Sequence, residues 1–214
     1  MAKVSVCIPT LTAYKELDNC IETIYASTKK VDDIYIIDNG RKLSKKYGDN
    51  VHITRVTSNL GVAKSWNWFI NNVPEIRIIC NDDVQFYPEA IQTMLESYDE
   101  NRLVYPNALN NMNSFSCFIL PDKIVKDVGL FDETISPNYA YFEDNDYHRR
   151  MLLAGYDIKP CDASVGHVGS STLKHFNKFM EEKHHPKFRL ARSNYNRKWG
   201  GEPGKETFAT PYNK

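Results

Sequence analysis

The sequence has 214 residues, 42% of them hydrophobic and 25% charged, a composition typical of a single globular domain. Its 27 basic residues balance 27 acidic ones, so bulk charge does not indicate a nucleic acid partner. The first residues lack a signal-peptide pattern, and no stretch approaches the roughly 20 apolar residues that span a bilayer. The five cysteines form no C-x-x-C pair, which argues against a cysteine-rich zinc site. We therefore expect a soluble protein of the reducing cytoplasm.

Strand and helix patterns alternate through the first 100 residues. Short apolar runs predict strands at 4–10, 33–40, 52–61 and 76–80. Apolar residues at helical spacing predict helices around 17–25 and 62–73, and Pro88 begins a third helix at 89–98. Strands joined by short helical connections are typical of an α/β domain with a mainly parallel sheet.

After residue 100 the pattern changes. The sequence predicts strands at 102–106 and 114–121, a short helix at 123–129, and a helix at about 144–154 that Gly155 ends as a C-cap. One or two further helices are predicted within about 174–200, followed by an irregular segment. No repeat or linker divides the chain, so we expect one domain over residues 1–214 with a short helical C-terminal tail.

Polar residues follow the predicted parallel strands at Thr10, Asp38, Asn59 and the adjacent pair Asp82 and Asp83. In open α/β sheets, ligands bind outside the carboxyl ends of the strands. Two neighbouring carboxylates repel each other, and a metal ion would remove that repulsion; alternatively, the two acids cap the helix that follows. Neither a G-x-G-x-x-G fingerprint nor a Walker P-loop is present. A nucleotide at this edge would therefore be held by side chains and a metal.

Six segments occur in one order: VSVCIPT (4–10), DNG (38–40), NLGVAKSWN (59–67), NDD (81–83), YFEDNDYHRRMLLAGY (141–156) and VGHVGSST (165–172). Together they resemble the family 2 glycosyltransferases of the GT-A fold, over about residues 3–172. The resemblance implies a GT-A-like (Rossmann-like) mixed, mainly parallel sheet flanked by helices. It also implies a nucleotide-sugar-binding half at 1–100, an acceptor and catalytic half at 101–172, and a helical tail at 173–214.

The resemblance assigns a metal site to the end of the fourth predicted strand. Asp83 takes the place of the carboxylate that binds Mn²⁺ or Mg²⁺, ions that complete their ligand shell with substrate phosphates and water. His167 resembles the histidine that reaches back to this ion, although a lone histidine at a strand end also fits a structural role. Asn81 stands where many members have the first acid, and Asp82 is assigned to the ribose.

The resemblance also implies residues that bind a nucleotide-sugar donor. Asp38 matches the acid that contacts the base, where a carboxylate accepting from the uracil N3–H favours a UDP-sugar over dTDP or GDP donors. Trp66 replaces a common Arg, so either Lys64 supplies the missing charge or the Trp packs in the core. The residues implied for donor binding are Pro9, Thr10, Asp38, Asn59, Gly61, Lys64, Asn67, Asn81 and Asp82.

Glu143 and Asp144 match the E-D motif of the family at the start of a helix, and both are assigned to catalysis. Asp144 would be the general base that removes a proton from the acceptor hydroxyl, in one displacement that inverts the anomeric configuration. A helix N-terminus favours the ionised carboxylate, although the two acids also fit a plain acidic first turn. The acceptor would be a glycan or another hydroxyl compound. The candidates for contacting it are Asn113, Ser114, Tyr139 and Tyr141.

Two other functions are compatible with these residues. A nucleotidyltransferase of related α/β build would release pyrophosphate, but it leaves the E-D motif and GHVGSS without a role. A non-catalytic nucleotide-sugar-binding module fits the replacements at Asn81 and Trp66. Retention of Asp83, Asp144 and His167 together favours the metal-dependent glycosyltransferase.

Overall fold

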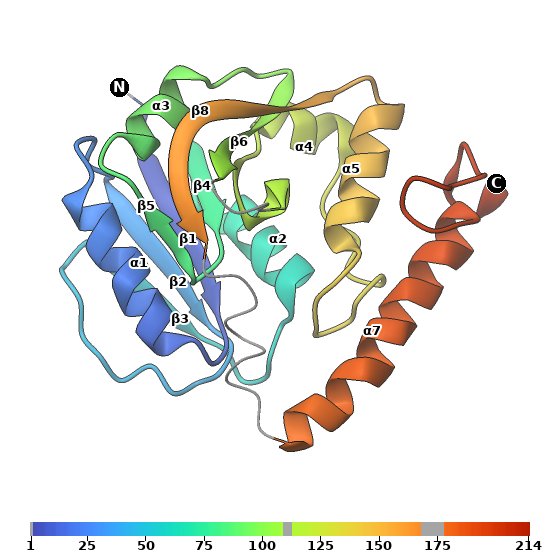
Figure 1. The fold of residues 1–214 in the computed structure, drawn as a ribbon, viewed down its shortest axis with the longest axis horizontal. Helices are drawn as coiled ribbons and strands as arrows, with labels where there is room; N and C mark the ends of the chain where they lie inside the picture. The colour runs from blue at the N-terminus through green and yellow to red at the C-terminus, as the bar shows by residue number, and fades with distance from the viewer. Residues whose placement is uncertain (1, 109–112, 168–177) are drawn as a thin grey trace.

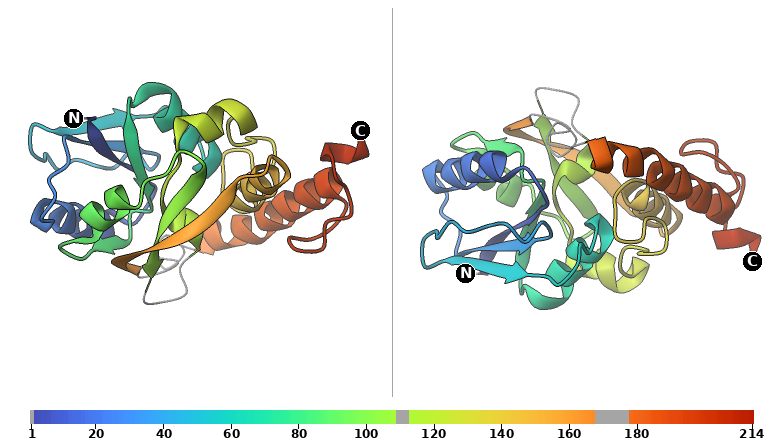
Figure 2. Two further views of the ribbon diagram at one scale, coloured as in Figure 1. Left: turned by 90° about the horizontal axis from the view of Figure 1, so that it is seen from above. Right: turned by 90° about the horizontal axis from the view of Figure 1, so that it is seen from below.

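The structure is a computed structural model that describes residues 2–108, 113–167 and 178–214. Within these residues, eight strands form one mixed sheet in the order β3-β2-β1-β4-β7-β6-β8-β5, with helices on both faces (Figures 1 and 2). The strands are β1 (Val4–Thr10), β2 (Asp33–Asp38), β3 (Val51–Arg55), β4 (Ile76–Cys80), β5 (Val84–Phe86), β6 (Arg102–Ala108), β7 (Cys117–Ile119) and β8 (Asp157–His167). The helices are α1 (Tyr14–Ala26), α2 (Val62–Asn72), α3 (Ala90–Glu96), α4 (Asp122–Val128), α5 (Glu143–Leu153) and α7 (Lys178–Trp199), with 3₁₀ turns η1 (Ser114–Ser116) and η2 (Pro211–Asn213).

Strands β1 to β4 form the parallel part of the sheet. β1 pairs with β2 on one side and β4 on the other, and β3 pairs with β2, all in parallel. Almost every residue of β1 and β4 is buried, which is why their sequences are near-continuous apolar runs. Thr10 lies opposite Asp38 in the register of β1 and β2, so the polar ends of these strands meet at one edge. The predicted mixed, mainly parallel α/β sheet is confirmed.

The second part of the sheet reverses direction. β7 lies antiparallel between β4 and β6, β8 runs parallel to β6, and β5 pairs antiparallel with the end of β8. The sequence did not predict β5 or β8, because β5 has three residues and β8 contains both Pro160 and Gly166. Their pairing matters for the site, since it places Val84 opposite His167.

Two hydrophobic clusters cover the two faces of the sheet. One joins Val6 and Ile8 of β1 to the buried faces of α1 and α3. The other joins Cys7 of β1 to α2, α4 and α5, with Trp66 and Tyr147 in its centre. Alternate residues of β1 thus point to opposite cores, as expected for a central strand. All five cysteines are buried free thiols, in keeping with the lack of a C-x-x-C pair.

The C-terminal helix α7 lies beside α5 and is anchored at its end (Figures 1 and 2). The buried carboxylate of Asp146 accepts a hydrogen bond from Trp199 Nε1 at 2.8 Å and pairs with Lys198 Nζ at 2.6 Å. Lys198 also pairs with Asp132 at 2.7 Å, and Arg150 pairs with Asp146 at 2.9 Å. The part of the predicted tail helix before residue 178 lies outside the described residues. Across the described ranges, none of the helices has the length and apolar character needed to cross a membrane.

Candidate active site

The turn after β4 brings two predicted residues together at the carboxyl edge of the sheet. Thr10 Oγ1, at the end of β1, donates a hydrogen bond to Asp82 Oδ2 at 2.7 Å, and both residues are buried. Burial, together with the nearby charge of Asp83, raises the pKa of Asp82 to about 7. The neighbouring Asn81 is partly exposed, and its backbone N–H donates to the carbonyl of Ser116 at 2.8 Å.

Asp83 and His167 face each other across the β5–β8 pair. His167 Nε2 lies 3.1 Å from Asp83 Oδ1, close enough for an ion pair. The same nitrogen is buried and has no hydrogen-bond partner among the described residues. An oxygen and a nitrogen about 3 Å apart, with one of them lacking a hydrogen-bond partner, fit two ligands of one divalent ion.

Few side chains near Asp83 and His167 could serve as further metal ligands. Within residues 2–108, 113–167 and 178–214, no group of three or more His, Cys, Asp or Glu side chains is arranged to hold a metal. Mg²⁺ and similar ions are often held by one or two carboxylates, with substrate phosphates and water supplying the other ligands. Asp83 and His167 therefore fit an ion that is shared with a phosphate-bearing substrate.

Asp38 lies at the end of β2 and is completely buried. Its Oδ1 accepts hydrogen bonds from Tyr14 Oη at 2.9 Å and from the Arg41 N–H at 2.7 Å. Its Oδ2 accepts from the Leu43 N–H at 3.0 Å. Through the bonds to Arg41 and Leu43, the carboxylate holds the loop after β2 at the end of the strand. Pro9, one residue before the end of the neighbouring β1, is only partly exposed.

The start of α2 connects the first half of the chain to the segment before α5. Gly61 has φ 76°, and a Cβ there would lie 2.3 Å from the backbone nitrogen of Tyr139, so this close approach requires glycine. The Val62 N–H donates to the Tyr139 carbonyl at 2.7 Å, and Asn59 Oδ1 accepts from the Gly61 N–H at 2.9 Å. Lys64 is exposed on the same helix.

Two further side chains of α2 are buried. Asn67 is fully hydrogen-bonded, because its amide donates to Phe131 O and Glu133 Oε1 and accepts from Phe131 N–H, each at 2.9 Å. Trp66 packs against Phe118 and Phe131, as its helical spacing predicted. Asn67 therefore fastens the 131–133 segment to α2, and the structure does not bring it into the pocket described below.

The predicted catalytic acids begin helix α5. Asp144 is partly exposed, and its carboxylate accepts hydrogen bonds from the Asn145 N–H at 2.8 Å and from Asn113 Nδ2. Glu143 is buried, and burial together with the charge of Asp144 raises its pKa to about 8. The two residues before it, Tyr141 and Phe142, have φ of 90° and 68°, a backbone region that is strained for aromatic side chains.

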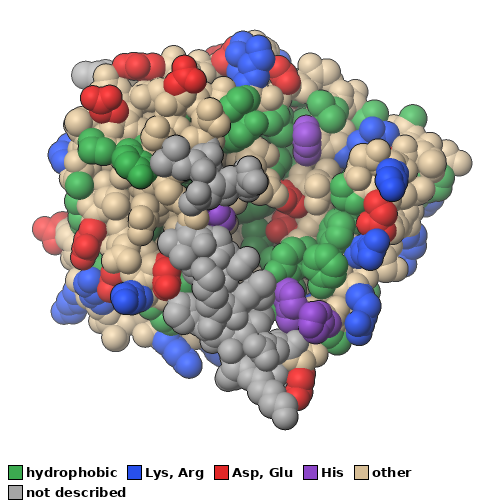
Figure 3. Space-filling model, viewed as in Figure 1, with side chains coloured by type: hydrophobic (Ala, Val, Ile, Leu, Met, Phe, Trp, Pro, Cys, Tyr) green, Lys and Arg blue, Asp and Glu red, His purple; other side chains and the backbone are tan. Residues whose placement is uncertain are grey.

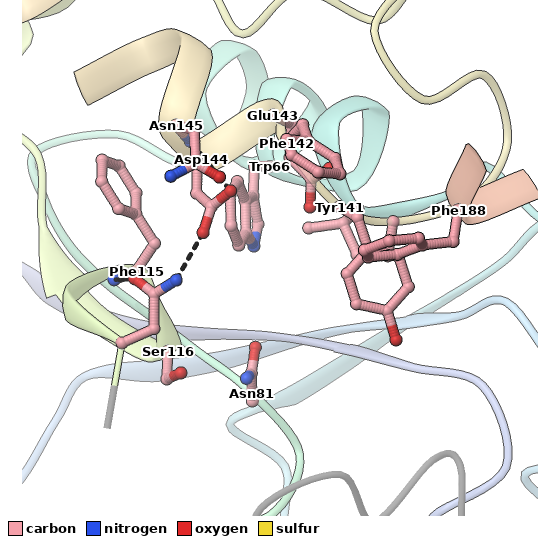
Figure 4. Close-up of a pocket in the computed structure, with 13 residues that line it drawn as sticks. Trp66, Asn81, Phe115, Ser116, Tyr141, Phe142, Glu143, Asp144, Asn145 and Phe188 are labelled. Atoms are coloured by element: carbon pink, nitrogen blue, oxygen red, sulfur yellow. Dashed lines mark hydrogen bonds between the residues drawn. The ribbon is translucent and has the colours of Figure 1, made fainter. Parts of the chain in front are cut away.

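These residues surround a pocket of about 350 Å³. Figure 3 shows this face of the molecule hollowed near its centre, with acidic side chains inside and hydrophobic ones toward α7. In Figure 4, Asp144 points into the pocket between Phe115 and Trp66, Asn81 lies across from it, and Tyr141 and Phe188 form another side. The lining consists of Val62, Trp66, Asn81, Asn113, Phe115, Ser116, Ala140, Tyr141, Phe142, Glu143, Asp144, Asn145 and Phe188.

The pocket lining includes some predicted residues and several that were not predicted. Of the four acceptor candidates, Asn113 and Tyr141 line it, whereas Ser114 and Tyr139 do not. Phe188 was missed, because a single aromatic residue in a basic tail carries no motif that relates it to the E-D motif 44 residues earlier in the chain. Phe115 and Ser116 were read only as part of a strand, yet η1 turns them toward the pocket.

Comparison with known proteins identifies the chain's relatives. A profile described as Glycosyl transferase family 2 matches residues 5–123, which is more than half of the chain. No curated protein matches it. Among solved structures, mannosyltransferase PcManGT from Pyrobaculum calidifontis, in complex with GDP-Man and Mn²⁺, is 12% identical with a TM-score of 0.60, over 91% of this chain and 69% of that one.

Two further solved structures share the fold. S. aureus TarS 1-349 in complex with UDP-GlcNAc is 15% identical with a TM-score of 0.57, over 89% of this chain and 66% of that one. GalNAc-T7 with UDP, GalNAc and Mn²⁺ is 11% identical with a TM-score of 0.63, over 78% of this chain and 44% of that one. These similarities confirm the predicted GT-A-like fold.

Proposed function

The chain belongs to glycosyl transferase family 2 and is a glycosyltransferase, and from this premise we propose that it is a metal-dependent, inverting enzyme that uses a UDP-sugar. The observation that carries the proposal is the position of Asp144, which points into the pocket from the first turn of α5, across from Asn81 of the turn that also holds Asp83 (Figure 4). A base and a donor site on opposite sides of one pocket are what a single displacement requires.

Asp144 takes the proton of the acceptor hydroxyl. The acceptor oxygen forms a bond to the anomeric carbon while the bond from that carbon to the diphosphate oxygen breaks, and the nucleoside diphosphate leaves. Asn113 Nδ2 and the Asn145 N–H orient the carboxylate of Asp144.

The donor lies along the carboxyl edge of β1, β2 and β4. Asp82, held by Thr10, would face the ribose, and Asp83 and His167 would hold the Mn²⁺ or Mg²⁺. When bound, such an ion neutralises the negative charge that develops on the leaving diphosphate. The similar structures solved with GDP-Man and Mn²⁺ and with UDP-GlcNAc support this class of donor.

The preference for uridine rests on Asp38. Its Oδ1 accepts from the hydroxyl of Tyr14, and this side-chain donor can rotate away so that the uracil N3–H takes its place. The two backbone donors, Arg41 and Leu43, would keep the carboxylate fixed while the base binds. A donor with guanine would present a different hydrogen-bonding edge to this carboxylate.

The test is a panel of UDP-, dTDP- and GDP-sugars with Mn²⁺, scored by release of free nucleoside diphosphate in the absence of an acceptor. We expect slow hydrolysis of one UDP-sugar that stops when EDTA removes the metal. UDP with Mn²⁺ at a hundred times its dissociation constant should also raise the free energy of unfolding by about 2.7 kcal/mol. If no nucleotide-sugar of the panel is hydrolysed and no nucleotide stabilises the protein, the proposal is contradicted.

A further inference from the structure

The segment NYNRKWGG (194–201) of the tail has no part in the reaction described above. Two of its side chains reach helix α5 and meet at one carboxylate. Asp146 is completely buried, and its Oδ1 accepts a hydrogen bond from Trp199 Nε1 at 2.8 Å and pairs with Lys198 Nζ at 2.6 Å. Its Oδ2 accepts from Arg150 Nε at 2.9 Å. Asp146 therefore has partners on both oxygens, and two of these three partners come from the tail.

The charges around Asp146 are balanced away from water. The side chain of Lys198 is 6% exposed, and its ammonium also pairs with Asp132 at 2.7 Å. Two carboxylates and two cations thus form one unit, the Asp146 network, which consists of Asp132, Asp146, Arg150, Lys198 and Trp199. A buried charge is costly without its partners, so a fully paired network permits few arrangements of its members. It therefore fixes the end of α7 against the first turn of α5.

Asp146 and the proposed base lie in the same helical turn. Successive residues of an α-helix are about 100° apart, so Asp144 and Asp146 project from nearly opposite sides of α5. Asp144 points into the pocket (Figure 4), whereas Asp146 meets the end of α7. The Asp146 N–H donates to the Phe142 carbonyl at 3.0 Å, which closes the turn that carries Asp144. A shift of Asp146 would therefore move Asp144 as well.

The tail also contacts the segment that precedes Asp144. Tyr141 and Phe142 have φ of 90° and 68°, and such strain persists only where the surrounding structure holds it in place. Their rings lie 5.1 Å and 5.4 Å from the ring of Phe188 in α7. Helix α7 thus holds the chain on both sides of Asp144, through Phe188 before it and through the Asp146 network after it.

We propose that Lys198 and Trp199 are positioning residues of the transfer reaction, which act through Asp146 to hold the carboxylate of Asp144 toward the acceptor hydroxyl. The inference rests on the proposed function, in which Asp144 is the base. Neither tail residue lines the pocket, so their effect should appear in the rate and not in the binding of the donor. The family profile ends at residue 123, so this role belongs to a part of the chain that the profile does not match.

The test variant is Trp199→Phe, which keeps an aromatic ring and removes the N–H that bonds to Asp146. Its matched control is Tyr195→Phe, because Tyr195 is also a completely buried aromatic residue of α7 that donates to a carboxylate. That carboxylate is Glu206 of the tail itself, so the control leaves the Asp146 network intact. Circular dichroism and urea unfolding check that both variants are folded under the assay conditions.

Hydrogen exchange followed by mass spectrometry measures the hold on α5 without any substrate. Trp199→Phe should speed the exchange of the backbone amides of residues 143–150, because this turn opens more readily once the Asp146 network has lost a bond. Tyr195→Phe should leave this exchange as it is in the wild type. Unchanged exchange in Trp199→Phe would overturn the proposal, whatever the donor panel shows.

The second measurement is the single-turnover release of UDP with enzyme in excess and Mn²⁺ present, from UDP-glucose, UDP-galactose or UDP-N-acetylglucosamine, whichever is hydrolysed fastest. Trp199→Phe should lower the rate about tenfold, since a misplacement of about 1 Å can cost about 100-fold, while the affinity for UDP with Mn²⁺ stays the same. Tyr195→Phe should keep the wild-type rate. In the Asp144→Asn background, Trp199→Phe should have no further effect, because the group that it displaces is already removed.

The outcomes separate this proposal from the proposed function. If Asp144→Asn loses the rate but Trp199→Phe lowers it equally in both backgrounds, Trp199 does not act through Asp144, and only the positioning proposal is wrong. If Asp144→Asn keeps the wild-type rate, the base assignment is wrong and the positioning role fails with it. If none of the UDP-sugars is hydrolysed, the proposed donor reaction fails, and the positioning role that depends on it is overturned as well.

Discussion

Buried polar side chains differ in their hydrogen bonding between the carboxyl edge of β2 and the pocket beside α5. Asp38, at the edge, is completely buried, and each of its oxygens accepts hydrogen bonds from the protein itself. Trp66 and Glu143, at the pocket, are almost as buried but have polar atoms without partners among the described residues. In the free protein, Asp38 holds the loop after β2 through these hydrogen bonds, whereas Nε1 of Trp66 and Oε2 of Glu143 have no partner among the described residues.

This contrast separates two consequences of substitution. Removing a satisfied buried group leaves its partners unpaired and lowers the free energy of unfolding. Removing an unsatisfied one leaves nothing further unpaired in the free protein, so it should lower activity or binding more than stability. The next three predictions address the metal site, Asp38 and Glu143, and are ordered from the largest of these expected effects to the smallest.

The largest effect is expected at the proposed metal site. Substitution of groups one shell further from a metal already lowers affinity about 10- to 100-fold, so Asp83→Asn should lower the metal-dependent hydrolysis of the donor at least about 100-fold. The dependence of the rate on Mn²⁺ concentration measures this. The chain offers a matched control in Asp33, whose Oδ1 lies 2.7 Å from Nε2 of the half-exposed His52. If Asp33→Asn had the same effect as Asp83→Asn, the metal assignment would be wrong.

Asp38→Asn should destabilise the protein by about 3 kcal/mol, because an amide cannot accept from all three donors and leaves at least one buried N–H or O–H unpaired. Urea unfolding measures the change. Asp162→Asn, at an exposed position of β8, should change stability by less than about 0.5 kcal/mol. A variant of Asp38 that kept full stability and lost only UDP affinity would break the contrast between the two regions.

The smallest effect is a pH dependence from Glu143, whose pKa is raised from 4.5 to about 8. Between these values the folded protein keeps a proton that the unfolded chain has released, so the free energy of unfolding falls as pH rises. One such proton contributes up to about 1.4 kcal/mol per pH unit. This contribution is absent above about pH 8.

Glu143→Gln removes this proton, so the stability of the variant should depend less steeply on pH. The measurement compares urea unfolding of the wild type and the variant at pH 6 and pH 7. The wild type should lose up to about 1.4 kcal/mol more than the variant over this interval. Parallel losses in the two proteins would mean that Glu143 is ionised in the folded state.

The sequence predicted the central strands and the order of the motifs, because both are local. VSVCIPT and IRIIC are short apolar runs typical of buried strands, and Asn81, Asp82 and Asp83 follow the second one directly. The three-residue β5 and the irregular β8 were not predictable from periodicity. Their pairing is nevertheless what places His167 beside Asp83.

The limits of sequence reasoning at the site have the same physical origin. Asn67 carried a donor-binding expectation because of its motif, but its hydrogen-bond partners Phe131 and Glu133 lie 64 and 66 residues further along the chain. Phe188 reaches the pocket from α7, whose end is anchored to α5 through Asp146. Contacts over such separations depend on tertiary packing and leave no local pattern.

The most direct test of the central claim is the rate of nucleoside diphosphate release by Asp144→Asn, with Asp162→Asn as control and UDP–Mn²⁺ affinity measured on the same samples. If Asp144 is the general base of the pocket, the rate should fall by about 10²- to 10⁴-fold while stability and UDP–Mn²⁺ affinity remain those of the wild type. A variant that binds UDP and Mn²⁺ and still turns over at the wild-type rate would contradict the account.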